Sequence, residues 1–116
     1  MYSLTSANRY YLYQGFVRMN LGIDGLFKII RLEMKDLSPV SGDIFLFFGK
    51  SRQSVKILRW DGDGFLLYYK RLEGGSFELP TFNPNTGNYE ISYQVLSFIL
   101  NGVSLKSVRL RKRFRI

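Results

Sequence analysis

Two aspartates alternate with two glycines in the stretch WDGDGF, Trp60 to Phe65, which lies between two apolar runs. Closely spaced carboxylates are ligands for calcium and magnesium, and Asp-x-Asp-Gly resembles part of a calcium-binding loop. The acidic residue that closes such a loop is missing at the expected spacing. A two-metal nuclease would need about three convergent carboxylates, and the candidates here are Asp24, Asp61 and Asp63. The alternative interpretation is that the stretch is only the turn of a β-hairpin.

The composition excludes most other catalytic chemistry, because the chain of 116 residues contains neither cysteine nor histidine. Disulfides, thiol catalysis, Cys- or His-ligated metals, a His general base and a Ser-His-Asp triad are therefore ruled out. Only carboxylate-based metal chemistry stays open, with nine acidic residues to supply it. We expect no cofactor, no resident metal and no enzymatic activity, with a metal-dependent nuclease as the remaining catalytic alternative.

The net charge of +8 points to an anionic partner, and most of it belongs to the C-terminus. Residues 106–116 hold six basic and no acidic side chains, against 11 basic and nine acidic in the rest of the chain. In VRLRKRFRI the arginines alternate, so an extended chain would align them along one side. We predict that this tail contacts nucleic-acid phosphates through Arg109, Arg111, Lys112, Arg113 and Arg115. The alternatives are a solvated tail, or a strand added to a partner protein.

Weaker binding candidates lie earlier in the chain. Lys28, Arg31 and Lys35 share one helical face, and Lys70 and Arg71 stand at the end of a strand-like run; the alternative is that these are solvated surfaces. Five tyrosines could stack on exposed bases if they reach the surface, although tyrosines in strands are expected in the core. They are Tyr10, Tyr11, Tyr13, Tyr68 and Tyr69.

These side chains must be positioned by a small set of elements. An aromatic run, Tyr10 to Tyr13, predicts a strand, and Asn20 is a candidate N-cap for the helix that follows. Its apolar residues recur at helical spacing, at Ile23, Leu26, Phe27, Ile30 and Met34. The helix should end before Ser38-Pro39, because the residue before proline avoids helical geometry.

Three strand-like runs follow, over residues 44–48, 55–60 and 65–70, and the short turns between them predict an antiparallel meander. With Gly62-Asp63 as central turn residues, Trp60 pairs with Phe65 and Leu58 with Leu67. Leu58, Trp60, Phe65 and Leu67 then form an apolar set on one face. A glycine at the first central position suits a type II′ turn, and a four-residue loop from Asp61 to Gly64 would give the same pairing.

The last part of the chain predicts a loop and a short helix. Leu79 to Tyr89 contains prolines, asparagines and a glycine, which favours an irregular, mobile loop. Ser92 can cap a helix that ends at Gly102, with a buried stripe of Val95, Leu96, Ile99 and Leu100. We therefore predict an α+β fold: a small, mainly antiparallel β-meander packed with one longer and one short helix. Residues 1–104 would form a single domain, and 105–116 a basic C-terminal tail.

Several of these segments together resemble a known family. They are SGDIFLF from Ser41, KILRWDGDGF from Lys56, YKRLE from Tyr69, and then Gly75, Phe77 and Pro80. This pattern is similar to the TnpB accessory proteins of the insertion-sequence-66 family of bacterial transposons, which are products of the element's second open reading frame. Upstream, Met19 and Gly22 to Leu26 match the family's Met-Arg-Lys-Gly-Phe-Asp-Gly-Leu segment, and Leu100-Asn101-Gly102 matches a late Leu-x-Gly. The resemblance covers nearly the whole chain.

The sequence departs from the family in one place: Asn20-Leu21 replaces an Arg-Lys pair, and Arg18 replaces the acidic residue usual before the methionine. The resemblance implies a role in transposition beside a separate transposase that carries the strand-transfer chemistry. Two non-catalytic functions follow from it: binding DNA at the transposon ends while a transposase–DNA complex assembles, or docking the transposase without contact to nucleic acid. No apolar run reaches the roughly 18 residues of a membrane span, and no signal peptide is visible. We therefore expect a soluble protein of the bacterial cytoplasm with no membrane contact.

Overall fold

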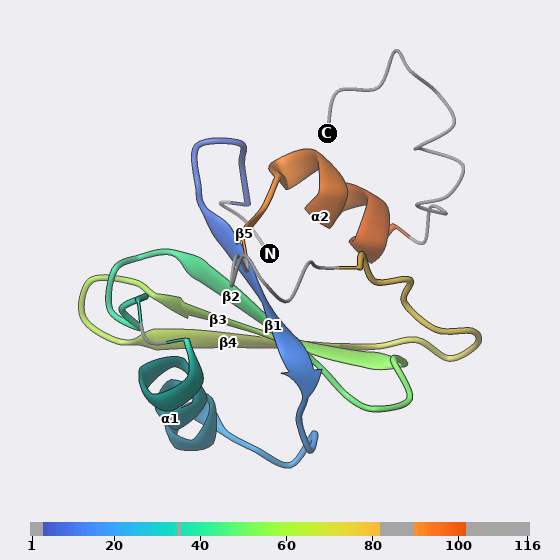
Figure 1. Cartoon of the computed structure of the whole chain (residues 1–116), viewed down its shortest axis with the longest axis horizontal. Coiled ribbons are helices and arrows are strands. Elements are labelled where there is room, and N and C mark those ends of the chain that lie inside the picture. The colour runs from blue at the N-terminus through green and yellow to red at the C-terminus, as the bar shows by residue number, and fades with distance from the viewer. Residues whose placement is uncertain (1–3, 35, 82–89, 102–116) are drawn as a thin grey trace.

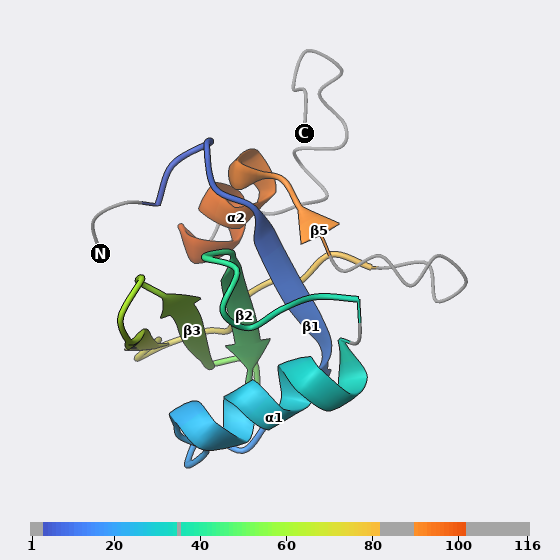
Figure 2. The ribbon, with the colours of Figure 1, turned by 90° about the vertical axis from the view of Figure 1, so that its left-hand side faces the viewer.

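The computed structural model describes residues 4–34, 36–81 and 90–101 of the chain. They form a mixed sheet of five strands in the order β4-β3-β2-β1-β5, with helices α1 and α2 on opposite faces (Figures 1 and 2). The elements run β1 (Tyr10–Phe16), α1 (Ile23–Glu33), β2 (Ile44–Phe48), β3 (Ser54–Trp60), β4 (Phe65–Arg71), β5 (Glu90–Ile91) and α2 (Tyr93–Leu100). The predicted α+β class is confirmed.

Three of the four strand pairings are antiparallel, as expected of a meander, and the fourth is parallel. Strands β2, β3 and β4 form the meander, and β5 pairs antiparallel with β1. Strand β1 lies parallel to β2, with Tyr10 opposite Ile44. A parallel pair needs a crossover rather than a tight turn, and α1 supplies it. The aromatic run Tyr10 to Tyr13 is thus the first half of a longer strand.

The predicted register of the central hairpin is confirmed. Trp60 pairs with Phe65 and Leu58 with Leu67. The Asp61 N–H donates to the Gly64 carbonyl at 2.8 Å, across the central residues Gly62 and Asp63. Of these two only Gly62 has a positive φ, at 88°, which agrees with the expected type II′ turn. The DGDG stretch is therefore the connection between β3 and β4.

The helix prediction is correct for the buried face of α1 and wrong for its start. Leu26 and Ile30 are buried, as the spacing indicated. Asn20 does not cap the helix: Gly22 is the N-cap residue, and no side chain caps it. The reason is a turn just before the helix, in which the Leu21 N–H donates to the Arg18 carbonyl at 3.1 Å. At α2 the prediction is confirmed, since the Ser92 hydroxyl accepts from the Val95 N–H at 3.1 Å. Gly102 lies outside the described residues.

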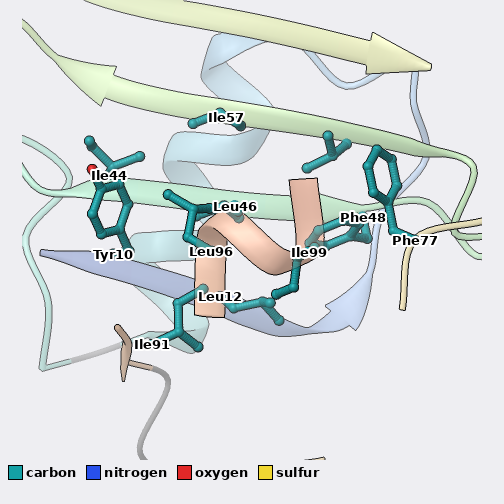
Figure 3. Close-up of a cluster of buried hydrophobic side chains, with 11 residues drawn as sticks. Tyr10, Leu12, Ile44, Leu46, Phe48, Ile57, Phe77, Ile91, Leu96 and Ile99 are labelled. Atoms are coloured by element: carbon teal, nitrogen blue, oxygen red, sulfur yellow. The ribbon is translucent and has the colours of Figure 1, made fainter. Parts of the chain in front are cut away.

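Each face of the sheet carries its own hydrophobic core. Under α2 the alternating side chains of β1, β2 and β3 pack with Ile91, Leu96 and Ile99, and Phe77 closes this core beside Phe48 (Figure 3). Under α1 the opposite residues of the same strands pack with the helix; the buried members are Tyr11, Val17, Leu26, Ile30, Met34, Phe45, Phe47 and Leu58. A sheet covered on both sides explains why β2 is buried along its whole length.

Two predictions about the organisation of the chain stay largely outside the described residues. Of the predicted loop from Leu79 to Tyr89, only residues 79–81 and Glu90 beyond it belong to the described part. The division into a domain of residues 1–104 and a tail of 105–116 also stays a prediction. Within the described ranges no helix is long and apolar enough to cross a membrane.

Candidate nucleic-acid interface

The strongest predicted contacts lie outside the part of the chain that the structure describes. They are the tail residues Arg109, Arg111, Lys112, Arg113 and Arg115, together with Lys35 near the end of α1. Of the predicted basic residues, Lys28, Arg31, Lys70 and Arg71 can be placed. The structure distributes these four over different surfaces.

The two described cations of α1 are exposed, and Arg31 already has an aromatic neighbour. Its guanidinium carbon lies 5.8 Å from the centroid of the Phe27 ring. Phe27 meets Phe65 edge-on at 5.8 Å, and Phe65 meets Trp60 at 5.0 Å. This row of rings fastens α1 to the β3–β4 hairpin, and a cation over an aromatic face stabilises it further. Arg31 thus has a structural role beside any contact with a partner.

Lys70 and Arg71 are consecutive in β4 and therefore point to opposite faces of the sheet. The Lys70 ammonium donates to the Leu100 carbonyl at 3.2 Å. A cation at the C-terminal end of α2 also suits the negative end of the helix dipole. Arg71 lies on the α1 face and pairs with Glu73 at 3.2 Å. The side chains of Arg71 and Glu73 are 61% and 83% exposed, so water and salt screen this pair strongly.

The carboxylates proposed for a metal site are not brought together. All nine acidic residues of the chain lie in the described ranges, and no three of them form a group that could hold a metal ion. Asp61 and Asp63 are exposed on the β3–β4 turn, and Asp24 lies in the first turn of α1. The metal-nuclease alternative therefore has no support from the geometry.

A group of basic residues, of which the sequence singled out only Arg71, lies where three segments meet, at the end of β3 remote from the DGDG turn. We call Arg18, Lys50, Arg52 and Arg71 the basic end; all four side chains are exposed. Arg18 precedes α1, Lys50 and Arg52 lie in the β2–β3 turn, and Arg71 ends β4. Their separation in the sequence hid them, and the only local signal was two cations in a short turn without an acidic residue.

Tyr69 is an exposed aromatic of this region, with 53% of its surface accessible. The Lys56 ammonium lies 5.7 Å from its ring centroid, and its hydroxyl is 3.3 Å from that of Ser54. Tyr10 and Tyr11 are buried, and Tyr13 and Tyr68 are partly covered. The expectation that strand tyrosines belong to the core thus holds for Tyr10 and Tyr11 and fails for Tyr69.

The pKa values of Arg9 and Tyr10 are displaced, and both residues lie away from the basic end. A hydrogen bond with Tyr11 raises the pKa of the Arg9 guanidinium, and the carboxylates of Glu90 and Asp43 reinforce the effect. Burial raises the pKa of the Tyr10 phenol, whose hydroxyl donates to the Thr5 carbonyl at 2.7 Å. Arg9 is therefore a cation with acidic neighbours, unlike Arg18, Lys50 and Arg52.

A shallow depression of about 610 Å³ lies beside β5 and the start of α2. Its lining contains one carboxylate, Glu90, and otherwise neutral side chains: Ser6, Asn8, Ile91, Ser92, Tyr93, Gln94 and Ser97. No general acid–base pair or metal-ligand set can be made from these residues, so the depression does not suggest a reaction.

Comparison with known proteins agrees with the resemblance seen in the motifs. Residues 8–110 match the family described as IS66 Orf2 like protein. The uncharacterized protein y4hO of Sinorhizobium fredii is 33% identical over 95 residues, which cover 82% of this chain and 80% of that protein. The uncharacterized protein y4jC of the same organism is 30% identical over 88 residues, covering 76% and 73% of the two chains. No solved structure shows significant similarity.

Proposed function

Because the chain belongs to the family of IS66 Orf2-like proteins, which are associated with transposition, we propose that it is a non-catalytic accessory protein for the transposition of an insertion sequence. The observation that carries the proposal is the family match over residues 8–110. In this role the protein acts in the bacterial cytoplasm beside the transposase of the same element, which performs the strand transfer. It binds DNA at the transposon ends or assists assembly of the transposase–DNA complex there.

The distribution of charge supports the DNA-binding form of this proposal. The described residues contain ten basic and all nine acidic side chains, so they are nearly neutral as a group. The excess of positive charge therefore belongs mainly to the C-terminal tail, residues 105–116, with its six basic side chains. A short cationic segment attached to a balanced domain can neutralise several phosphates and release their counterions.

Deletion of residues 106–116 tests this proposal. We expect the truncated protein to bind DNA more weakly and with a flatter salt dependence. The slope of log K against log salt should fall by about 4.5 if five tail cations each contact a phosphate. The measurement is a titration against the terminal repeats of the element and against an unrelated duplex, each at two salt concentrations. This design separates specific from non-specific binding.

An unchanged affinity and slope after truncation would exclude the tail as a DNA contact. The thermal unfolding midpoint of the truncated protein is measured first, so that a loss of affinity can be told apart from a loss of stability. A lowered midpoint would show that the tail supports the fold, and the affinity would then have to be compared with a variant in which the five cations are replaced by glutamine.

A second function, that of a protein–protein adaptor for the transposase, is favoured by the free edge of β4. This strand ends the sheet among the described residues, and its seven residues are paired on one side only. In an antiparallel ladder alternate residues direct their backbone groups away from the partner. The outward groups of β4 could accept an extended strand from another protein.

The two functions predict different effects of nuclease on the association with the transposase. Co-purification with the transposase that persists after nuclease treatment favours the adaptor, and an association lost with the DNA favours the DNA-binding form. A proline at Leu67, whose N–H points away from β3, should disturb strand addition and leave DNA binding intact.

A further inference from the structure

We propose that the basic end, made by Arg18, Lys50, Arg52 and Arg71, is a second DNA-contacting surface that binds the phosphate backbone of the duplex engaged by the tail. This inference deepens the DNA-binding form of the proposed function and rests on it. It assigns the contact to residues of the folded domain, most of which were not candidates in the sequence.

The three segments of the basic end are held together by direct contacts. The Val17 N–H donates to the Phe48 carbonyl at 2.9 Å, which ties the segment after β1 to the end of β2. Two residues later Met19 packs over Gly49, where a Cβ would meet its side chain at 3.3 Å. The Lys56 ammonium donates to the Leu21 carbonyl at 2.7 Å. Arg18 is therefore fixed next to the β2–β3 turn.

The β2–β3 turn is also braced from its other side. The Arg52 N–H donates to the Gly49 carbonyl at 2.9 Å, and the Arg52 carbonyl accepts from the Phe77 N–H at 2.6 Å. Phe77 itself is buried in the core under α2, and the Leu72 N–H bonds the Gln53 carbonyl at 2.7 Å. The turn is thus a fixed platform, from which Lys50 and Arg52 extend into solvent.

Arg52 occupies a backbone conformation that its side chain does not favour. Its φ is 60°, and it is the one non-glycine residue with positive φ among the described residues. Left-handed geometry costs a residue with a Cβ about 1–2 kcal/mol, and glycine would avoid that cost. A strained conformation is often found where the side chain has a function, and a long cation at this exposed position fits such a function.

The cations of the basic end have little internal neutralisation. Arg18, Lys50 and Arg52 have no ion-pair partner within the described ranges. Arg71 has Glu73, through an exposed pair that a phosphate can replace at little cost. Free guanidinium groups are suited to phosphate because their fork of donors matches its oxygens. The surface therefore presents four cations ready to bind an anion.

The C-terminal end of α2, the last described element, lies near the β4 end of this surface. Leu100, at the C-terminal end of α2, accepts the hydrogen bond of Lys70, and Lys70 adjoins Arg71 in β4. In Figure 1 this end of α2 and the β2–β3 turn lie toward the right-hand side, and the β3–β4 turn lies at the left. A duplex that binds the tail at its point of departure is thus brought close to the basic end.

Nucleic acid fits this surface better than an acidic protein does. The cations come from several segments and spread over a surface rather than lining a pocket, as suits repeated backbone phosphates. The exposed ring of Tyr69 lies among them and offers a stacking platform for a splayed base. Lys56 stands near the same ring and adds to the local positive potential.

The test uses the full chain and compares two variants with equal loss of charge. One is the double variant Lys50→Gln, Arg52→Gln; the control is Arg9→Gln, Arg59→Gln, which removes two cations that lie outside the basic end and were not predicted to bind nucleic acid. Thermal melts of both come first, and each affinity is then measured on a duplex at two salt concentrations. We expect the first variant to lose about tenfold in affinity and its slope to fall by about 1.8. The control should change much less.

The outcomes separate this inference from the function on which it rests. Equal losses in both variants, or no loss in the first, would overturn the basic end while tail-dependent binding keeps the proposed function. Absence of DNA binding by the unaltered chain would overturn both. If the first variant keeps its DNA affinity and loses the transposase instead, the surface is a protein contact and the inference is wrong. A double variant that melts early is replaced by Lys50→Gln alone, with an expected slope change of about 0.9.

Discussion

The two turns at the ends of β3 carry opposite charges and are held in place by different kinds of contact. The β3–β4 turn carries Asp61 and Asp63, and the β2–β3 turn carries Lys50 and Arg52. Each contains a residue with positive φ: Gly62 at 88° in the acidic turn and Arg52 at 60° in the basic one. The acidic turn uses glycine where its backbone requires it, whereas the basic turn keeps a long charged side chain there.

The surroundings of the two turns explain why only one of them becomes a candidate surface. The acidic turn is closed by its own backbone, through the bond from Asp61 to Gly64. The basic turn is held by residues from elsewhere in the chain, among them Met19, Leu72 and Phe77. The charge of the acidic turn therefore comes from its own residues, Asp61 and Asp63. Charge in the second is added to that of Arg18 and Arg71, because the fold brings these segments together.

The largest effect on stability is expected from Gly62→Ala in the acidic turn. A Cβ at Gly62 would meet nothing within 4 Å, so any loss arises from its positive φ. We expect the free energy of unfolding to fall by about 1–2 kcal/mol, measured by chemical denaturation. The matched control is Gly64→Ala, where a Cβ also has open space and φ is not in the left-handed region. That control should lie within about 0.5 kcal/mol of the original protein.

Equal losses for the two alanine variants would show that the turn does not depend on a left-handed residue at Gly62. The type II′ assignment would then be wrong, and the contrast between the turns would reduce to their charges. Neither substitution should alter DNA affinity, since neither changes a charge.

Sequence reasoning succeeded at the acidic turn because its information is local. Alternating apolar residues on both sides of a two-residue turn fix the register, and Trp60–Phe65 pairing follows. The same holds for Ser92, whose capping bond joins residues three apart in the chain. The family resemblance likewise rests on contiguous stretches such as KILRWDGDGF.

The predictions that failed concern features that depend on contacts between residues distant in the sequence. Asn20 looked like a helix cap, but the segment before α1 is held by Phe48 and Lys56 and enters the helix through Gly22. The parallel pairing of β1 with β2 leaves no turn signal, because its connection is a helix. The basic end depends on the convergence of three segments, and no periodicity within one segment records that. Lys70 and Arg71 were grouped as neighbours, although a strand places them on opposite faces.

A moderate effect is expected from Lys56→Met. This variant tests whether a contact between distant residues holds the segment with Arg18 next to the basic turn. Lys56 joins β3 to the segment before α1 through its 2.7 Å bond to the Leu21 carbonyl. Methionine keeps most of the aliphatic stem and removes the donor. We expect a loss of about 1.5 kcal/mol in the free energy of unfolding, at the low end for a charged donor because the site is partly exposed. Faster amide hydrogen exchange should be confined to residues 18–22.

The matched control for this prediction is Lys28→Met, which removes a cation from the exposed face of α1 without removing a described hydrogen bond. It should change stability by less than about 0.5 kcal/mol. If Lys56→Met and Lys28→Met behave alike, the bond to Leu21 does not hold Arg18 in place. The four cations of the basic end would then be close together without being held in a fixed arrangement.

The smallest effect is expected from Arg52→Gly, and it has the opposite sign. Relief of the positive φ would stabilise the protein, and the greater freedom of glycine in the unfolded chain offsets part of that gain. We expect a net gain of about 0.5 kcal/mol in the free energy of unfolding, together with a several-fold loss of DNA affinity.

The control is Arg52→Ala, which removes the same charge and keeps the strain. It should lose a similar amount of DNA affinity without gaining stability. Equal stability of the glycine and alanine variants would show that Arg52 carries no strain, whereas a glycine variant that is more stable and still binds DNA fully would separate the strain from function. If the turn keeps an arginine at position 52 for its charge, Arg52→Gly must make the protein more stable and weaken its affinity for DNA.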